Sequence, residues 1–340
     1  MNDFSPSETN AALHLKEIAR KTGFSISSVS RALNSYPDKN SHISEKTRQK
    51  IVESARKTGF RRNRAAEFMR RGSQPTIGVF VPTVSSSLTA DLILGISEVL
   101  TEEDFPVQIG SFQSKDDFHH FISRNTALSH AGIITYPLLI SNDQVREEMK
   151  AYRHGGGKVV LLNSTLHMEG VPVVSMDESL GGRLAAERLL ERSCERFAVL
   201  GEYETRNTSF LETLEARGKT AKAIPKDPFE EGPEGLAEVV EFCRGATESQ
   251  PAGVFAVTDD LALRVIREFA ATPLRIGREI LLIGYDDLEL TSLMTPALTT
   301  LHQPMREKGR LAARKLINIL YNRPETSTIL QPRLVIRDTA

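Results

Sequence analysis

Residues 15–34 read LKEIARKTGFSISSVSRALN, and the spacing of their apolar side chains predicts two short helices. Gly23 lies between the two. The apolar positions are Leu15, Ile18 and Ala19 in the first helix and Val29, Ala32 and Leu33 in the second. Two short helices joined by a glycine-containing turn form a helix-turn-helix, whose second helix can lie in the major groove of DNA.

The second helix of this pair carries small polar side chains and almost no acidic charge. Its polar positions are Ser25, Ser27, Ser28, Ser30, Arg31 and Asn34. Hydroxyl and amide groups can donate to and accept from the edges of bases, and an arginine can reach a guanine or a phosphate. The segment therefore has the chemistry of a DNA-reading helix.

Charge is distributed unevenly along the chain. Residues 1–72 carry a net charge of +8, from 15 Lys and Arg against 7 Asp and Glu, whereas the rest of the chain carries −9. A basic head on an acidic body is typical of a phosphate-binding domain joined to a domain that binds something else.

Length and composition exclude several classes of protein. The 340 residues are 40% hydrophobic and 26% charged, which is typical of a globular protein of two or three domains. Cys194 and Cys243 have no partners at metal-ligand spacing, so we expect no disulfide framework, no metal site and no cofactor. The N-terminal residues lack the pattern of a signal peptide, and no stretch reaches the roughly 18 apolar residues of a membrane span. We therefore expect a cytoplasmic protein without contact to a membrane.

The first 74 residues divide into three parts. Residues 1–12 are polar and predict a disordered leader. Residues 13–60 form the helix-turn-helix domain, with a third helix that begins near Ser44 and ends at Gly59. Residues 61–74 are rich in alanine and arginine, and they predict a short hinge helix or linker that becomes ordered on a partner.

From Thr76 onward, short β-branched runs alternate with helical stretches. Such alternation predicts parallel sheets built from right-handed strand–helix–strand units. The fold class is therefore α/β, with an all-α helix-turn-helix head and a doubly wound, two-lobed domain over residues 75–340. We expect one lobe over about 75–162 and 304–328, and the other over about 163–303 and 329–340. A ligand would bind between them, at the carboxyl ends of the strands.

An ordered set of motifs resembles the lactose-repressor (LacI/GalR) family of bacterial regulators. The motifs are I-A-x-x-x-G-x-S-x-x-[ST]-V-S-R-x-L-N (18–34), I-S-E-K-T-R-x-K-I (43–51), N-R-x-A (63–66), I-G-V-x-x-P (77–82), R-x-x-x-F (206–210), T-D-D-L-A (258–262), I-G-Y-D-D (283–287) and P-A-L-T-T-L-H-Q-P (296–304). The resemblance implies a lobed domain like that of periplasmic binding proteins. It also implies a homodimer that represses transcription at a near-palindromic operator.

The resemblance assigns DNA contacts to two segments. In the recognition helix they fall on Ser25, Ile26, Ser27, Ser28, Ser30, Arg31 and Asn34, where Ile26 would contact a thymine methyl group. In the hinge they fall on Asn63, Arg64, Ala66 and Met69. Met69 stands where the family places a leucine that wedges into the minor groove, so the strength of the resulting kink is open.

The resemblance also implies a small-molecule effector in the cleft between the lobes, a sugar, a sugar phosphate or a nucleobase. Arg206 falls on the sugar-contacting arginine of the family, and a guanidinium can fork onto two hydroxyls or a carboxylate. Asp286 can accept from two ring hydroxyls. Further candidates are Asn163, Thr258 and Met305. Whether the ligand induces or co-represses is left open.

Catalytic motifs are missing from the sequence. It has no G-x-S-x-G, no Walker loop and no metal-spaced histidine cluster, so we do not expect an enzyme. Two alternatives stay open at this point: a sugar-binding protein of the periplasmic type with an appended basic head, and a sugar-modifying enzyme.

Overall fold

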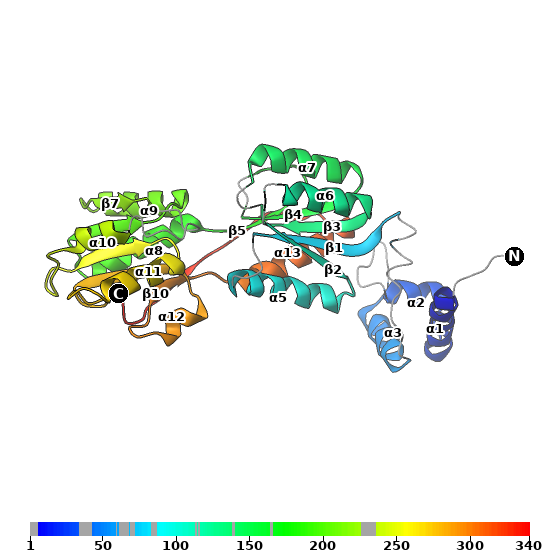
Figure 1. Ribbon diagram of the computed structural model, residues 1–340. Coiled ribbons are helices and arrows are strands. Elements are labelled where there is room, and N and C mark those ends of the chain that lie inside the picture. Colours follow the sequence, from blue (N-terminus) through cyan, green and yellow to red (C-terminus); the bar gives the residue numbers. More distant parts are fainter. Residues whose placement is uncertain are drawn as a thin grey trace.

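The computed structural model describes residues 6–33, 43–58, 60, 68, 72–82, 87–112, 114, 116–137, 140–163, 166–225 and 236–340. The predicted helix-turn-helix is present at its N-terminal end (Figure 1). Its helices are α1 (Pro6–Thr22), α2 (Ile26–Ala32) and α3 (Glu45–Lys57). They enclose a small core of Ile18, Val29, Ala32, Ile51 and Ala55. Gly23 has a φ of +77° in the turn between α1 and α2, a backbone conformation that glycine adopts without strain.

The expectation of a disordered leader over residues 1–12 is wrong from Pro6 onward, because α1 begins there. Proline suits the first turn of a helix, where its missing N–H has no partner to lose. Ala11 and Ala12 then continue the helix with the strongest helix-forming residue type. The polar composition of this segment concealed that propensity.

The described residues of the predicted hinge segment 61–74 are Phe68, Gly72, Ser73 and Gln74, and Phe68 is the one with a large apolar side chain. Its side chain is 2% exposed and packs edge-on against Phe105, with 5.6 Å between the ring centroids. It belongs to the hydrophobic core of the first lobe. The hinge positions Asn63, Arg64, Ala66 and Met69, like Asn34 of the head, lie outside the described residues.

The first lobe contains a six-stranded parallel sheet in the order β11-β5-β4-β3-β1-β2. Its strands are β1 (Gln74–Val81), β2 (Val107–Ser111), β3 (His130–Thr135), β4 (Lys158–Leu162), β5 (Val173–Met176) and β11 (Thr328–Leu330). Helices α5 (Ser87–Glu102) and α13 (Met305–Leu320) cover one face, and α6 (Asp117–Ala127) and α7 (Asn142–His154) cover the other (Figure 1). A Cβ at Gly95 would lie 2.0 Å from the carbonyl oxygen of Arg306, so glycine allows α5 and α13 to pack closely.

The second lobe contains a six-stranded sheet in the order β12-β10-β9-β8-β6-β7. Its strands are β6 (Arg196–Leu200), β7 (Ala221–Ile224), β8 (Ala252–Ala256), β9 (Ile280–Asp286), β10 (Thr299–His302) and β12 (Arg333–Val335). All pairings are parallel except that of β12 with β10. The helices are α8 (Glu178–Glu191), α9 (Glu204–Glu215), α10 (Leu236–Cys243), α11 (Asp259–Phe269) and α12 (Glu289–Leu293).

The chain passes between the two sheets three times: after β5, after β10 and after β11. The sequence placed the first passage at residue 163, and the structure corrects it to the end of β5 at Met176. The first lobe likewise keeps β11, up to Leu330. Parallel neighbours usually need a helical crossover of a dozen or more residues, and only residues 163–172 join β4 to β5. That short connection made the pairing hard to foresee.

Candidate functional site

Helix α2 presents a polar face away from the small core of the head. Ser25 is its N-cap, with an extended backbone (φ −64°, ψ 152°) and a hydroxyl that accepts from the N–H of Ser28 at 3.1 Å. Val29 and Ala32 are buried, whereas Ile26 is 46% exposed. Ser25, Ser27, Ser30 and Arg31 are also exposed, and Ser28 is half-buried. An apolar side chain and several hydroxyls thus share the surface that a recognition helix turns to DNA.

Arg31 lies at the C-terminal end of α2. Its Nε donates to the carbonyl oxygen of Ser27 at 3.3 Å, one helical turn back. This bond directs the exposed guanidinium along the same helix surface as Ser27. The arrangement leaves the positive charge available to a phosphate or a guanine.

A second polar cluster lies at the carboxyl ends of strands from both sheets, and Arg206 is its centre in the second lobe. The side chain is 3% exposed. Nε donates to Glu178 Oε2 at 2.7 Å, and Nη1 donates to the carbonyl oxygen of Val257 at 2.5 Å. The guanidinium lies over the rings of Tyr203 and Tyr285, 3.9 and 3.5 Å from their centroids. It is therefore rigidly oriented.

Glu178 stays ionised beside this guanidinium. Burial disfavours its charge, but the neighbouring Arg206 outweighs burial and holds the pKa of the carboxyl below its usual value. The Tyr285 hydroxyl lies close enough to the Glu178 carboxylate to help lower its pKa, but within the described ranges neither that hydroxyl nor Glu178 Oε1 makes a well-formed hydrogen bond. Such atoms are costly unless a ligand or water supplies a partner.

Asp286 ends β9 and is 8% exposed. Its Oδ1 accepts from Gln303 Nε2 at 2.7 Å. Its φ of +134° is rare for a residue with a side chain, and such backbone strain concentrates at functional sites. Burial raises the pKa of Asp286 to about 8, although the charge of Arg206 opposes the shift.

The first lobe contributes Tyr136, Asn163 and Lys308. Tyr136 follows β3 and Asn163 follows β4. Asn163 Nδ2 donates to the Tyr136 hydroxyl at 2.7 Å, and Asn163 Oδ1 accepts from Lys308 Nζ. Lys308, on α13, is 0% exposed. Burial lowers its pKa to about 7, with Glu178 opposing and Arg206 adding to the shift. Side chains of the two lobes therefore interact electrostatically across this cluster.

The structure thus brings together three of the five predicted effector residues: Arg206, Asp286 and Asn163. Thr258 has a structural role as the N-cap of α11, where its hydroxyl accepts from the N–H of Leu261 at 3.3 Å. Met305 is buried in the core of the first lobe, because α13 begins there and packs on α5. This placement does not support an effector contact for Met305.

Sequence reasoning missed Lys308, Glu178 and the tyrosines. A lysine on an amphipathic helix is normally exposed, so position alone gave no reason to single out Lys308. One signal was available: Lys308 stands one helical turn after the strand-to-helix crossover that follows the motif at 296–304.

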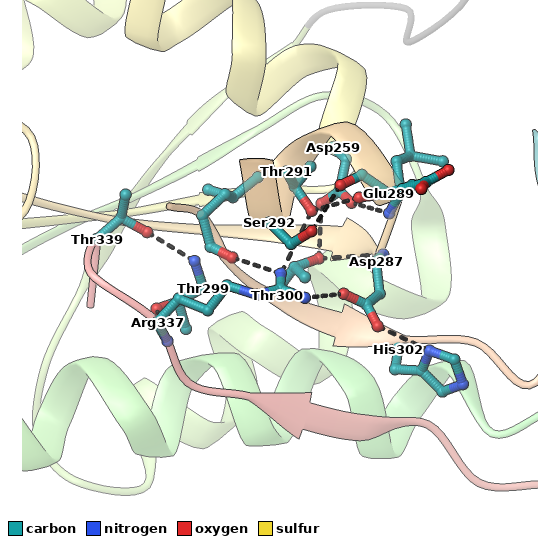
Figure 2. Close-up of polar contacts among 12 residues, drawn as sticks. Asp259, Asp287, Glu289, Thr291, Ser292, Thr299, Thr300, His302, Arg337 and Thr339 are labelled. Atoms are coloured by element: carbon teal, nitrogen blue, oxygen red, sulfur yellow. Dashed lines mark hydrogen bonds and ion pairs between the residues drawn. The ribbon is translucent and has the colours of Figure 1, made fainter. Parts of the chain in front are cut away.

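A hydrogen-bonded network around Asp259 and Asp287 lies next in sequence to Asp286, where β9 ends (Figure 2). Asp259 accepts from the Thr300 hydroxyl at 2.6 Å and from the N–H of Leu288 at 2.9 Å. Asp287 pairs with His302 at 2.9 Å and with Arg337 at 2.5 Å. The carboxylates of Asp286 and Asp287 thus have different partners, and they do not form an acid–base pair.

The described residues contain neither a metal-binding group nor a membrane-spanning helix. In the part of the chain that the structure describes, no three His, Cys, Asp or Glu side chains form a group that could hold a metal ion. No helix in the same ranges is long and apolar enough to cross a membrane. Both cysteines are buried, and burial raises the pKa of each thiol to about 12.

Comparison with known proteins identifies both parts of the chain. Residues 14–63 match the family described as "Bacterial regulatory proteins, lacI family", and residues 186–340 match a "Periplasmic binding protein-like domain". The chain is 25% identical to the ribose operon repressor of Bacillus subtilis over 329 residues, which cover 93% of this chain and 94% of that protein.

Solved structures share the fold. A LacI-family regulator from Enterococcus faecium with bound ribose is 24% identical, with a TM-score of 0.67 over 78% of this chain and 98% of that one. A lac repressor dimer bound to operator and an anti-inducer is 21% identical, with a TM-score of 0.65 over 96% of this chain and 98% of that one. The chain thus joins a helix-turn-helix domain of the lacI family of bacterial regulatory proteins to a periplasmic-binding-protein-like domain.

Proposed function

We propose that this chain is a sequence-specific transcriptional repressor whose operator affinity is controlled by a small-molecule effector, a sugar or sugar derivative, bound between its two lobes. The observation that carries the proposal is the joining of two sites in one chain. The exposed face of α2 suits DNA, and the cluster around Arg206 and Asp286 suits a hydroxylated ligand.

The effector region favours a polyhydroxylated ligand for a chemical reason. Among the described residues, Glu178 Oε1 and the Tyr285 hydroxyl are buried close to each other without a well-formed hydrogen bond. Ring hydroxyls both donate and accept, so they can satisfy both atoms at once. The relatives whose structures hold ribose or an anti-inducer have the same fold, which supports this class of ligand.

Coupling between the two sites follows from the connections of the lobes. Three passages of the chain join them, so a ligand that contacts both lobes favours one angle between the sheets. Phe68 ties the hinge segment to the core of the first lobe, so that angle can reach the head. A differential affinity of about 1.4 kcal/mol already changes operator binding tenfold.

The proposed assembly is a cytoplasmic homodimer. Two heads related by a two-fold axis would read the halves of a near-palindromic operator. The proposal includes no catalytic activity.

Mobility shift with DNA from upstream of its own gene tests the proposal. The expected result is a specific shift that weakens steeply as salt rises, because lysine and arginine release counterions from phosphates. A periplasmic-type binding protein with a basic head would give only unspecific shifts, and an enzyme would turn over its sugar. The repressor function is refuted if no specific shift is seen, whether the chain then binds DNA without specificity or turns over a sugar.

A further inference from the structure

Lys308 is a buried cation without a carboxylate partner. Its side chain is fully buried on the first turns of α13. Within the described residues, Nζ donates to one amide oxygen, that of Asn163, and lies 5.4 Å from the centre of the Tyr136 ring. An ammonium has three N–H groups, and burying it without a counter-ion is costly. By contrast, Lys315 on the same helix has its own carboxylate, Glu325, at 3.0 Å.

Arg206, the second cation of the cluster, also has N–H groups without an acceptor among the described residues. Arg206 uses Nε and Nη1 for Glu178 and Val257, and no described residue accepts from its Nη2. The guanidinium is held by two tyrosine rings and cannot turn away. Its free edge is therefore preorganised for one more acceptor.

Lys308 and Arg206 come from opposite lobes, and both lie close to Glu178. The charge of Arg206 lowers the pKa of Lys308 and the charge of Glu178 raises it, so all three groups lie within electrostatic reach. Glu178 forms the ion pair of Arg206, so Lys308 has no carboxylate partner among the described residues. An anionic ligand beside Nζ would supply one and would favour the charged form of the lysine, which burial disfavours.

We propose that the effector is an anionic sugar, whose carboxylate or phosphate group lies between Lys308 Nζ and Arg206 Nη2 and links the two lobes. This inference rests on the proposed function and narrows its ligand class. Ring hydroxyls would reach Asp286, Asn163 and the unpaired oxygen of Glu178. A neutral sugar satisfies those acceptors but leaves the lysine without a counter-ion.

Calorimetry with matched sugars tests the inference on the full chain. The panel pairs D-glucose with D-gluconate, D-glucuronate and D-glucose 6-phosphate, and D-ribose with D-ribose 5-phosphate, so that the neutral, carboxylate and phosphate arms are separate. We expect at least one anion to bind tenfold or more tightly than its neutral parent. In Lys308→Met, that anion should lose roughly tenfold to a hundredfold in affinity, while the neutral parent changes less than about threefold.

Lys315→Met is the matched control, because it removes a buried ammonium from the same helix, away from the cluster. It should leave the ratio of anionic to neutral affinity unchanged. Thermal unfolding without ligand gives a second measurement. Lys308→Met should unfold at the same or a higher temperature than the wild type, because it removes an uncompensated charge. A lysine needed only for packing would give a lower temperature.

The outcomes separate this inference from the function on which it rests. A neutral sugar that binds as tightly as its acid and phosphate, and releases the operator, overturns the anionic effector and leaves the repressor intact. A Lys308→Met variant that weakens neutral and anionic ligands equally also overturns it. Binding of no sugar of either class overturns both the anionic effector and the sugar-controlled function.

Discussion

At the scale of single residues, the effector region depends on buried charges whose cost is only partly compensated. Arg206 and Glu178 compensate each other at 2.7 Å. Asp286 and Lys308 have no such ion pair, and burial moves the pKa of each toward neutrality. The free energy of unfolding should therefore depend on pH through these two side chains.

Replacing Asp286 by asparagine tests this dependence. In the folded protein the pKa of Asp286 is raised to about 8, above its unfolded value of about 3.9. The group therefore stabilises the fold fully below about pH 4, and this contribution is lost as pH rises toward 8. Asp286→Asn keeps an acceptor for Gln303 and should flatten the decline, which is at most about 1.4 kcal/mol per pH unit. Denaturant unfolding at about pH 5, 6.5 and 8 measures how the free energy of unfolding changes with pH. If this dependence is the same in the variant and the wild type, the pKa of Asp286 is not raised in the folded protein.

The sequence alone identified some residues of the effector region and missed others. Arg206 and Asp286 stand in spaced motifs, and the strands that precede them place them at one edge of the sheet. Lys308, Glu178 and Tyr136 have no local signal, because their burial depends on the approach of two lobes. The environment of Met305 is decided by packing in the core of the first lobe, a non-local effect that the sequence does not show.

At the scale of elements, α2 combines a structural cap with a DNA-facing surface. Ser25 caps the helix through its hydroxyl and is itself exposed. Two substitutions separate these roles. Ser25→Ala should cost the head about 1 kcal/mol of stability. Ser25→Asp should keep the cap yet weaken operator binding by tenfold or more, because its carboxylate repels phosphates.

Circular dichroism for stability and fluorescence anisotropy for DNA affinity measure the two effects. Ser193→Asp, in the second lobe, is the control for added charge. If Ser25→Asp binds operator as tightly as the wild type, this face of α2 does not contact DNA.

Phe68 joins the hinge segment to the first lobe, and its loss should act on both. Phe68→Ala should cost about 3–5 kcal/mol of stability, as truncation of a buried phenylalanine does, and should also weaken operator binding. Phe118→Ala is the control, since Phe118 is equally buried on the opposite face of the same sheet. It should lower stability alone. Denaturant unfolding and operator titration distinguish the two, and equal operator affinity in both variants would contradict the coupling role of Phe68.

Most helices and strands could be predicted because the spacing of apolar residues follows which face of an element is buried. The alternating runs from Thr76 onward form the strands and helices of the two lobes, and the spacing at 15–34 forms the helix-turn-helix. The start of α1 at Pro6 could not be predicted, since a polar helix has no apolar period to reveal it. The pairing of β5 with β4 depends on long-range contacts that no local pattern encodes.

At the scale of the whole molecule, three passages of the chain connect two mostly parallel sheets. The simplest motion that this connection allows is a change in the angle between the two lobes. Arg206 of the second lobe and Lys308 of the first are both buried charged groups, so a bound ligand changes the electrostatic interaction between the lobes. The basic head lies beyond the first lobe (Figure 1), joined to it through the segment that includes Phe68. This order of parts connects ligand binding to DNA affinity.

The most direct test of this account is selection of bound sequences from random double-stranded DNA by the purified full chain at about 0.15 M salt. The account predicts recovery of one near-palindromic motif, which Arg31→Ala fails to enrich although it still folds. Recovery of DNA without any shared motif, by a folded protein, would contradict the central claim that this chain reads sequence.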